Sequence, residues 1–171
     1  MTFKIVVRSA FDEYLREMHT AMDGLTPEDL RWQPDPGSNH ITWLVWHMAR
    51  VEDGWVSEAR KTEQVWATSD WPEKLGLADL GGSNGWGWDT EQVAGMPEIS
   101  KDNLIGYYAD VRAVTFAEFD KMTDADMSLP WSHPKSSLTS IASIFGHIIV
   151  EESQHLGQIA FIRGMLRGTN N

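Results

Sequence analysis

Four long stretches of the chain carry apolar residues at the spacing of an α-helix, and no strand pattern competes with them. Apolar side chains that recur every three or four residues lie on one face of a helix. The stretches cover roughly residues 3–22, 40–61 and 101–122, and a fourth that starts at 138 or 139 and ends at 168. Each apolar face needs a partner to bury it, so the pattern predicts an all-α fold, a four-helix bundle with a long crossover loop.

The ends of these stretches carry capping signals. Ser38 or Asn39 is expected to cap the second helix and Ser100 the third, because a side-chain oxygen there can accept a hydrogen bond from the first turn. Gly168 is expected to end the fourth helix. The residues expected to face the core are Ile5, Val6, Phe11, Leu15, Met18, Met22, Ile41, Leu44, Met48, Val51, Trp55, Leu104, Tyr107, Tyr108, Val111, Phe119, Ile144, Ile148, Ile159 and Ile162.

The connections differ in length. Thr26 and Pro27 are typical of the start of a short extra helix after the first long one. Residues 66–95, rich in glycine, aspartate and tryptophan, predict the long crossover, with one short helix near residues 72–77. With 171 residues and no repeat or linker, the chain is expected to form one domain over residues 1–171.

Charge and cysteine content bear on partners and location. The formal net charge is −11 at pH 7, and no cluster of Lys and Arg forms a local positive patch. Such a surface repels polyanions, so we expect neither nucleic acid nor an anionic membrane as a partner. No run approaches the ~18 apolar residues of a membrane span, and no signal-like segment opens the chain, which favours a cytoplasmic protein. There is no cysteine, so any thiol chemistry would need sulfur from another molecule.

The last helical stretch places polar residues on its apolar stripe. Glu151 and His155 fall among isoleucines there, and residues four apart share one helix face. A buried carboxylate needs a proton, a basic side chain or a metal ion to offset its charge. Glu151 and His155 are therefore candidates to grip one ion together. The alternative is a core histidine hydrogen-bonded to Glu151 with no ion.

A third ligand would come from the second helix, where His47 shares a face with Leu44 and Val51. His147 is eight residues from His155, about 12 Å along the axis, so those two cannot bind the same ion. The candidate metal set is therefore His47, Glu151 and His155. Three protein ligands leave positions open for water or substrate, as in catalytic zinc sites, and two nitrogens with a carboxylate also suit iron or nickel.

Other residues near these positions have two readings. His147 and Gln158 are candidates to orient the ligands through hydrogen bonds, and His147 is also a candidate for a catalytic role. The alternatives are a helix-face or core position for His147, and close helix packing through Gly157 in place of a role for Gln158. Trp43, Trp46 and Arg50 are candidates for a substrate pocket.

The alternatives to a pocket are core packing for the two tryptophans and a surface salt bridge for Arg50; Arg163 is open to the same two readings as Arg50. His40 is expected at the helix start, as a cap or in contact with solvent. Glu52 and Asp53 are expected on a solvated face.

With these residues in hand, the sequence resembles the DinB-like superfamily of four-helix metal proteins. The resemblance covers nearly the whole chain and rests on "PGSNHITWLVWHMARVEDGW", the "GW" crossover near residues 85–88, and "GHIIVEESQHLGQIAFIRGMLRG". The family's second ligand on the last helix precedes a Gly-Gln, here Gly157 and Gln158, which assigns it to His155. The other ligand on the last helix lies four residues earlier, at Glu151. A glutamate at that position resembles the branch of mycothiol-dependent maleylpyruvate isomerases. His47 matches the family's ligand on the second helix.

The resemblance implies a divalent metal, most simply zinc with nickel or iron as alternatives, and a possible homodimer. It further implies a thiol transferase or isomerase that joins an electrophilic substrate to a small thiol such as mycothiol or bacillithiol. The metal would hold that thiol as thiolate. Two alternatives stay open: a metal-dependent hydrolase that activates water, and a non-catalytic metal-binding bundle of the stress response.

Overall fold

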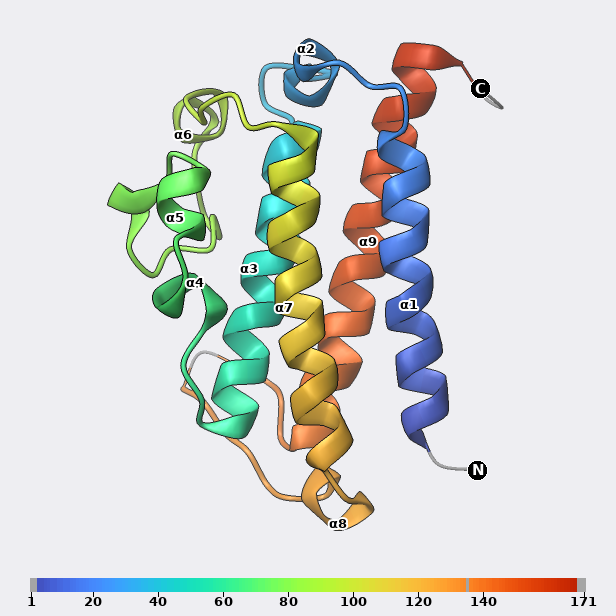
Figure 1. Ribbon diagram of the computed structural model, residues 1–171, viewed down its shortest axis with the longest axis vertical. Helices are drawn as coiled ribbons and strands as arrows, with labels where there is room; N and C mark the ends of the chain where they lie inside the picture. The colour runs from blue at the N-terminus through green and yellow to red at the C-terminus, as the bar shows by residue number, and fades with distance from the viewer. Residues whose placement is uncertain (1–2, 135, 169–171) are drawn as a thin grey trace.

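The computed structural model describes residues 3–134 and 136–168. Four long helices lie side by side (Figure 1): α1 (Phe3–Met22), α3 (Ile41–Arg60), α7 (Lys101–Lys121) and α9 (Ile141–Arg167). Over the described residues there is no strand, only one isolated bridge between Pro130 and Ser140. The prediction of an all-α four-helix bundle is confirmed. None of the helices described is both long enough and apolar enough to cross a lipid bilayer.

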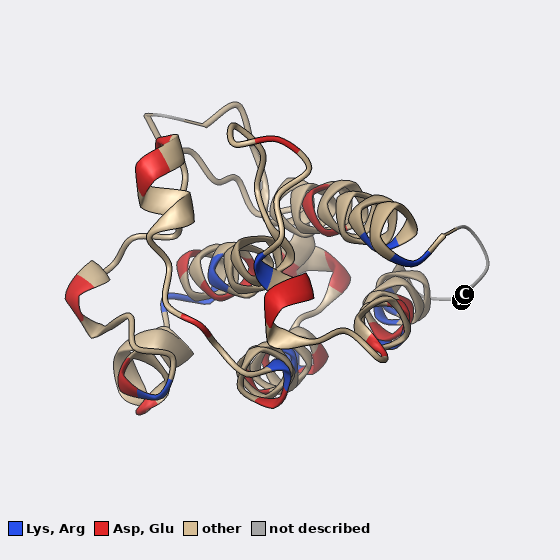
Figure 2. Ribbon diagram, turned by 90° about the horizontal axis from the view of Figure 1, so that it is seen from above, with Lys and Arg blue, Asp and Glu red and all other residues tan. Residues whose placement is uncertain are grey.

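The direction of the helices explains the crossover. α1 and α9 run one way along the bundle, and α3 and α7 run the other way (Figure 1). α3 and α1 each pack against both α7 and α9. Because consecutive long helices α3 and α7 are parallel, the chain must travel back along the bundle between them. The predicted crossover makes this return, beside the bundle when viewed from above (Figure 2).

The crossover is more structured than predicted. It contains α4 (Val65–Thr68), α5 (Trp71–Lys74), a 3₁₀ turn (Ala78–Leu80) and α6 (Thr90–Ala94). Only the helix at α5 was expected, because helices of four or five residues are too short to show a periodic pattern. Two further short helices, α2 (Pro27–Arg31) and α8 (Asp124–Met127), complete the connections.

Most capping residues act as predicted. Thr26 caps α2 with a reciprocal bond to Asp29, and Ser100 accepts from the backbone of Asn103 at 3.2 Å. Gly168 ends α9 with φ 84°, a left-handed conformation that favours glycine. α9 begins at Ile141 after the cap Ser140, two to three residues later than the start expected at 138 or 139.

The cap at Ser38 or Asn39 predicted for α3 is wrong, whereas the prediction of His40 as a cap is confirmed. His40, not Ser38 or Asn39, is the capping residue, and its Nδ1 accepts from the backbone N–H of Trp43 at 3.0 Å. The Nε2 of His40 bonds the carbonyl of Val93 at 3.0 Å, so the ring also ties α3 to α6. Burial explains the choice, because a ring at this inward-facing start can satisfy two backbone groups at once.

The predicted core residues are buried or partly buried, except at the start of α1. Ile5 and Val6 are 58% and 65% exposed, so that part of the prediction is wrong. The buried face of α1 instead runs through Phe3, Val7 and Phe11, at spacings of four residues. Ile5 and Val6 lie outside this face because a helix turns about 100° per residue.

A buried ionic cluster ties three helices together. Arg112 of α7 donates to Glu52 of α3 at 2.9 Å and to Glu152 of α9 at 2.7 Å, and all three are at most 2% exposed. Tyr108 accepts a further bond from Arg112 at 2.7 Å. Burial, with the neighbouring carboxylate of Glu52, raises the pKa of Glu152 well above its usual value. The guanidinium of Arg112 lies within ion-pair distance of both carboxyl groups and offsets their charge.

This cluster overturns the expected solvated face on α3. Glu52 is fully buried and Asp53 is 4% exposed. Asp53 accepts from the backbone N–H groups of Val65 and Trp66, both at 2.9 Å, and thereby caps α4. The sequence hides these roles because the partners, Arg112 and the crossover backbone, come from distant segments.

Candidate metal centre

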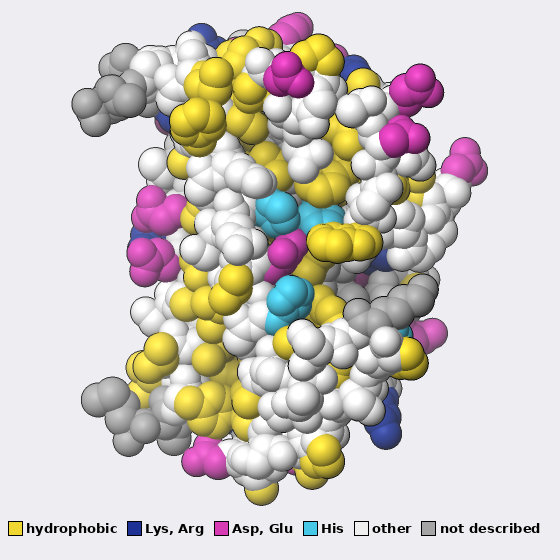
Figure 3. All heavy atoms as spheres, turned by 180° about the vertical axis from the view of Figure 1, so that it is seen from behind, with side chains coloured by type: hydrophobic (Ala, Val, Ile, Leu, Met, Phe, Trp, Pro, Cys, Tyr) yellow, Lys and Arg dark blue, Asp and Glu magenta, His cyan; other side chains and the backbone are white. Residues whose placement is uncertain are grey.

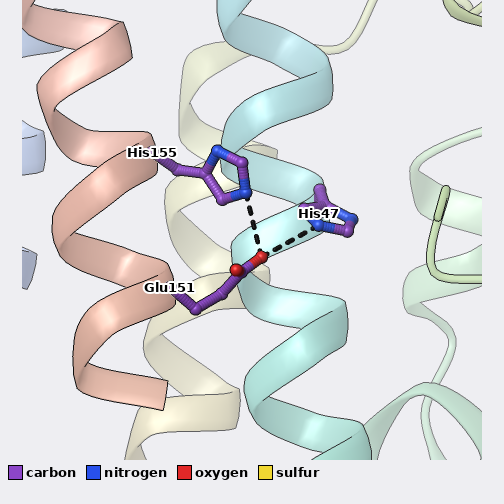
Figure 4. A group of neighbouring side chains, drawn as sticks. All are labelled: His47, Glu151 and His155. Atoms are coloured by element: carbon purple, nitrogen blue, oxygen red, sulfur yellow. Dashed lines mark hydrogen bonds and ion pairs between the residues drawn. The ribbon is translucent and has the colours of Figure 1, made fainter. Parts of the chain in front are cut away.

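Three side chains from two helices converge between α3 and α9 (Figure 4). His47 projects from α3, and Glu151 and His155 project from adjacent turns of α9. The Nε2 atoms of His47 and His155 lie 3.0 Å and 2.9 Å from the same carboxylate oxygen, Oε1 of Glu151. One possible ligand atom from each residue lies within 4.8 Å of the others. The i, i+4 spacing on α9 and the facing position on α3 thus bring together all three residues predicted as metal ligands.

The far side of each imidazole is also held. The carbonyl of Asn84 lies 2.5 Å from Nδ1 of His47, and Oε1 of Gln158 lies 2.7 Å from Nδ1 of His155. A carbonyl only accepts, so Nδ1 of His47 must carry the hydrogen. In the neutral ring Nε2 then offers a lone pair, and it points at a carboxylate.

The lone pair of His47 Nε2 faces an ionised carboxylate, an arrangement that favours a cation between the two atoms, either a proton or a metal ion. Such bonds from Nδ1 to carbonyl or amide oxygen commonly orient metal-bound histidines. The donor set therefore fits a divalent cation: two imidazole nitrogens and one carboxylate, with three protein ligands in all.

The electrostatics of the cluster favour a charged carboxylate. Burial raises the pKa of Glu151, but the hydrogen bonds to His155 and His47 outweigh it and hold that pKa well below its usual value. For His155, burial favours the neutral ring, but the bonds to Glu151 and Gln158 raise the net pKa. The low pKa of Glu151 thus favours an ionised carboxylate, which attracts a cation.

A cleft of about 440 Å³ opens directly onto Glu151. In the face drawn in Figure 3, imidazole side chains and an acidic side chain gather in a hollow. The residues that line the cleft come from α3, α9, the crossover and the loop before α9: Val51, Trp55, Asn84, Trp86, His133, Ser136, Ser137, Leu138, His147 and Glu151. A larger cavity of about 780 Å³ lies past the end of α3, but it contains none of the three converging residues, so we place the candidate site at the smaller cleft.

Comparison with known proteins agrees with this architecture. The model of the DinB superfamily matches residues 10–159, most of the chain. This protein belongs to the DinB superfamily. The crystal structure of a conserved protein from Enterococcus faecalis is similar over 99% of both chains, with a TM-score of 0.88 and 22% sequence identity. At that identity the likeness supports the DinB fold alone. A search of curated proteins finds no match.

Two residues predicted to support the ligands have different positions in this DinB bundle. Gln158 bonds His155 directly, as described above. His147 lines the cleft beside Glu151 and packs edge-on against Trp55, with ring centroids 5.5 Å apart. His147 is therefore placed to meet a molecule in the cleft, and it makes no hydrogen bond to the three ligand candidates.

The residues predicted for a substrate pocket lie behind the site. Trp43 stacks on the His47 ring, with centroids 4.4 Å apart and planes 13° from parallel. Trp46 is fully buried and packs against Trp66 and Trp88. Neither tryptophan lines the 440 Å³ cleft. Arg50 is 2% exposed, which overturns the surface salt bridge expected for it; it borders only a smaller adjoining cavity of about 220 Å³.

Sequence reasoning missed several contributors to the site. Asn84 acts through its backbone carbonyl, which leaves no trace in residue type. Trp86 is 83% exposed at the cleft, and the loop residues Ser136 and Ser137 line it. For Asn84 and Trp86 the signal was the richness of the crossover in tryptophan and glycine, which marked that segment as one with a role beyond connection. The loop that carries Ser136 and Ser137 lies outside the crossover and carried no such signal.

The raised pKa of His155 predicts how the metal-free DinB protein responds to pH. A histidine with a raised pKa contributes stability that is complete below its unfolded value, 6.5, and lost as pH rises through the folded value. Metal-free protein should therefore melt at a lower temperature as pH rises above about 6.5.

The measurement is Tm after chelator treatment at a series of pH values. His155→Gln should flatten this dependence, while His19→Gln, on the exposed side of α1, should leave it unchanged. A wild-type Tm that stays level or rises across this window would contradict the assigned protonation.

Proposed function

We propose that this DinB protein binds a divalent cation, most simply Zn²⁺, through His47, Glu151 and His155. The observation that carries the proposal is the convergence of two Nε2 atoms on one carboxylate oxygen, with both Nδ1 atoms already occupied. A resident cation resolves the repulsion among these atoms and neutralises the buried carboxylate. Family membership supports the same assignment.

We further propose a metal-dependent transferase or isomerase that uses a low-molecular-weight thiol. The chain has no cysteine, so the sulfur would arrive on a second molecule. A bound divalent cation would hold such a thiol as its reactive thiolate at neutral pH. The three ligands occupy one side of the site, and the cleft leaves Glu151 accessible from the other side.

The cleft residues suit an electrophile with apolar or aromatic parts. Trp55, Trp86 and Leu138 supply apolar surface, and the ring of His147 lies at the same wall. These side chains would hold the substrate beside the ligand cluster and displace water from it. His147 lies on α9, the helix that also carries Glu151 and His155, and it lines the cleft. Its imidazole would exchange a proton with the substrate.

The test combines metal loading with thiol transfer. Zn²⁺-loaded protein is assayed with mycothiol, bacillithiol, coenzyme A and glutathione against a small panel of electrophiles. We expect turnover with at least one thiol, and His47→Ala should reduce it to background while His19→Ala retains it. Absence of turnover with all four thiols would contradict the thiol chemistry. Ester hydrolysis that ignores added thiol would favour water activation instead.

A further inference from the structure

The crossover segment 81–85, hereafter the strap, passes over α3 beside His47. Four consecutive carbonyls of the strap accept hydrogen bonds from side chains of α3 and α4. Gly81 accepts from Nε1 of Trp66 at 2.7 Å, and Asn84 accepts from Nδ1 of His47 at 2.5 Å. Between them, Gly82 and Ser83 accept from the guanidinium of Arg50 at 3.3 Å and 3.2 Å.

All three nitrogens of the Arg50 guanidinium donate hydrogen bonds in this arrangement. Its Nη1 donates to Gln64 at 2.9 Å and lies 3.4 Å from Asp53, while Nε and Nη2 hold the two strap carbonyls. The guanidinium also lies over the ring of Trp66, 4.6 Å from its centroid. The contacts of Arg50 are those of a residue that fixes the crossover.

The end of the strap requires glycine. Gly85 has φ +86°, and a Cβ there would lie 2.8 Å from Cζ3 of Trp46 and 3.0 Å from Nε1 of Trp43. The strap therefore touches the two buried tryptophans directly, and Trp43 in turn stacks on the His47 ring. A side chain at position 85 would lift the strap away from α3.

We propose that the strap, held by Arg50 and Gly85, is a positioning device for the metal ligand His47. Arg50 fixes the carbonyls of residues 82 and 83, which sets the carbonyl of Asn84 on Nδ1 of His47. That bond holds the hydrogen on Nδ1 and directs the Nε2 lone pair toward Glu151 and His155. The metal-affinity part of this inference rests on the proposed function, whereas the orientation of the ring does not.

Two variants loosen the strap by different means. Arg50→Lys keeps the charge beside Asp53 but replaces the fork with one ammonium that cannot hold two carbonyls and Gln64 together. Gly85→Ala alters no polar group and acts through the contact with the tryptophans. The matched control is Trp71→Phe, which removes the bond from Trp71 to Asp110, 2.9 Å, at another point of the crossover.

Two measurements separate positioning from general stability, with folding of each variant checked by circular dichroism. The first is the Nδ1–H resonance of His47 in ¹⁵N NMR spectra of metal-free protein. We expect a resonance protected from exchange in the wild type and in Trp71→Phe, and its loss in both strap variants. The second is Zn²⁺ affinity by competition with a chelating dye, which the strap variants should weaken about ten- to hundredfold.

The outcomes distinguish this inference from the proposed function. If both strap variants keep the His47 resonance, the positioning role is overturned, whatever the Zn²⁺ affinity. If the resonance is lost but Zn²⁺ affinity equals that of the wild type, the strap orients the ring without serving the metal, and the inference fails in that part. If the wild type binds no Zn²⁺ while the resonance still depends on Arg50 and Gly85, the proposed function fails and the orienting role of the strap stands.

Discussion

Glu151→Gln should lower the affinity of the protein for Zn²⁺ by roughly a hundredfold or more. Zn²⁺ binds four-ligand structural sites with apparent free energies of about 10–16 kcal/mol, or about 3 kcal/mol per ligand. A loss of that size corresponds to about two orders of magnitude in affinity. The amide keeps the shape of the carboxylate but removes the single negative charge on which both imidazoles converge.

The measurement is metal content of purified protein, followed by Zn²⁺ titration of chelator-treated samples. Glu17→Gln is the matched control, because Glu17 is a half-exposed carboxylate on α1 and is not one of the three clustered residues. Equal metal content in wild type and Glu151→Gln would exclude these three residues as a metal site. The short contacts would then be explained by protonated histidines paired with Glu151.

Arg112→Met should be the most destabilising single change outside the metal centre, by about 3–5 kcal/mol. The substitution leaves two buried carboxyl groups, Glu52 and Glu152, without the cation that holds them. It also removes the hydrogen bond that Arg112 donates to the carbonyl of Phe11, and with it a link to α1. A loss of this size is a large fraction of the 5–15 kcal/mol that stabilises a typical domain. Urea unfolding followed by circular dichroism measures it.

Two further variants make that result specific. Arg8→Met is the matched control, since Arg8 also pairs with a carboxylate, at 2.6 Å, and lies over the ring of Phe116, but at the surface. Its cost should stay below about 1 kcal/mol. Glu152→Gln should also cost little, about 1 kcal/mol, because the raised pKa of Glu152 favours its neutral carboxyl form, which the amide resembles. A severe loss in Glu152→Gln would show that this group is ionised.

The sequence predicted the parts of the fold that depend on periodicity. Long amphipathic stripes located α1, α3, α7 and α9, and residue type alone identified caps such as Ser100. The same periodicity brought Glu151 and His155 together and placed His47 on the facing helix. Local rules suffice here because helix geometry is regular over many turns.

The rest could not be predicted because it depends on contacts between distant segments. The sequence predicted Glu52 on a solvated face, but its partner Arg112, sixty positions away, pairs with it inside the bundle. Arg50 looked like a surface or substrate-binding cation, yet its partners are carbonyls of the strap. The cleft is likewise assembled from four segments, and Trp86, one of its most exposed side chains, lies outside every periodic stretch.

The parallel arrangement of α3 and α7 has a consequence for how such a bundle diversifies. Because the chain must travel the length of the bundle between these helices, it carries an insertion that borders the cleft without contributing a ligand side chain. Substitutions at Trp86 or in the loop before α9 can therefore change which molecules fit the cleft, while His47, Glu151 and His155 keep their positions on α3 and α9. The same bundle can thus come to accept different molecules through substitutions in the crossover and in the loop before α9 alone.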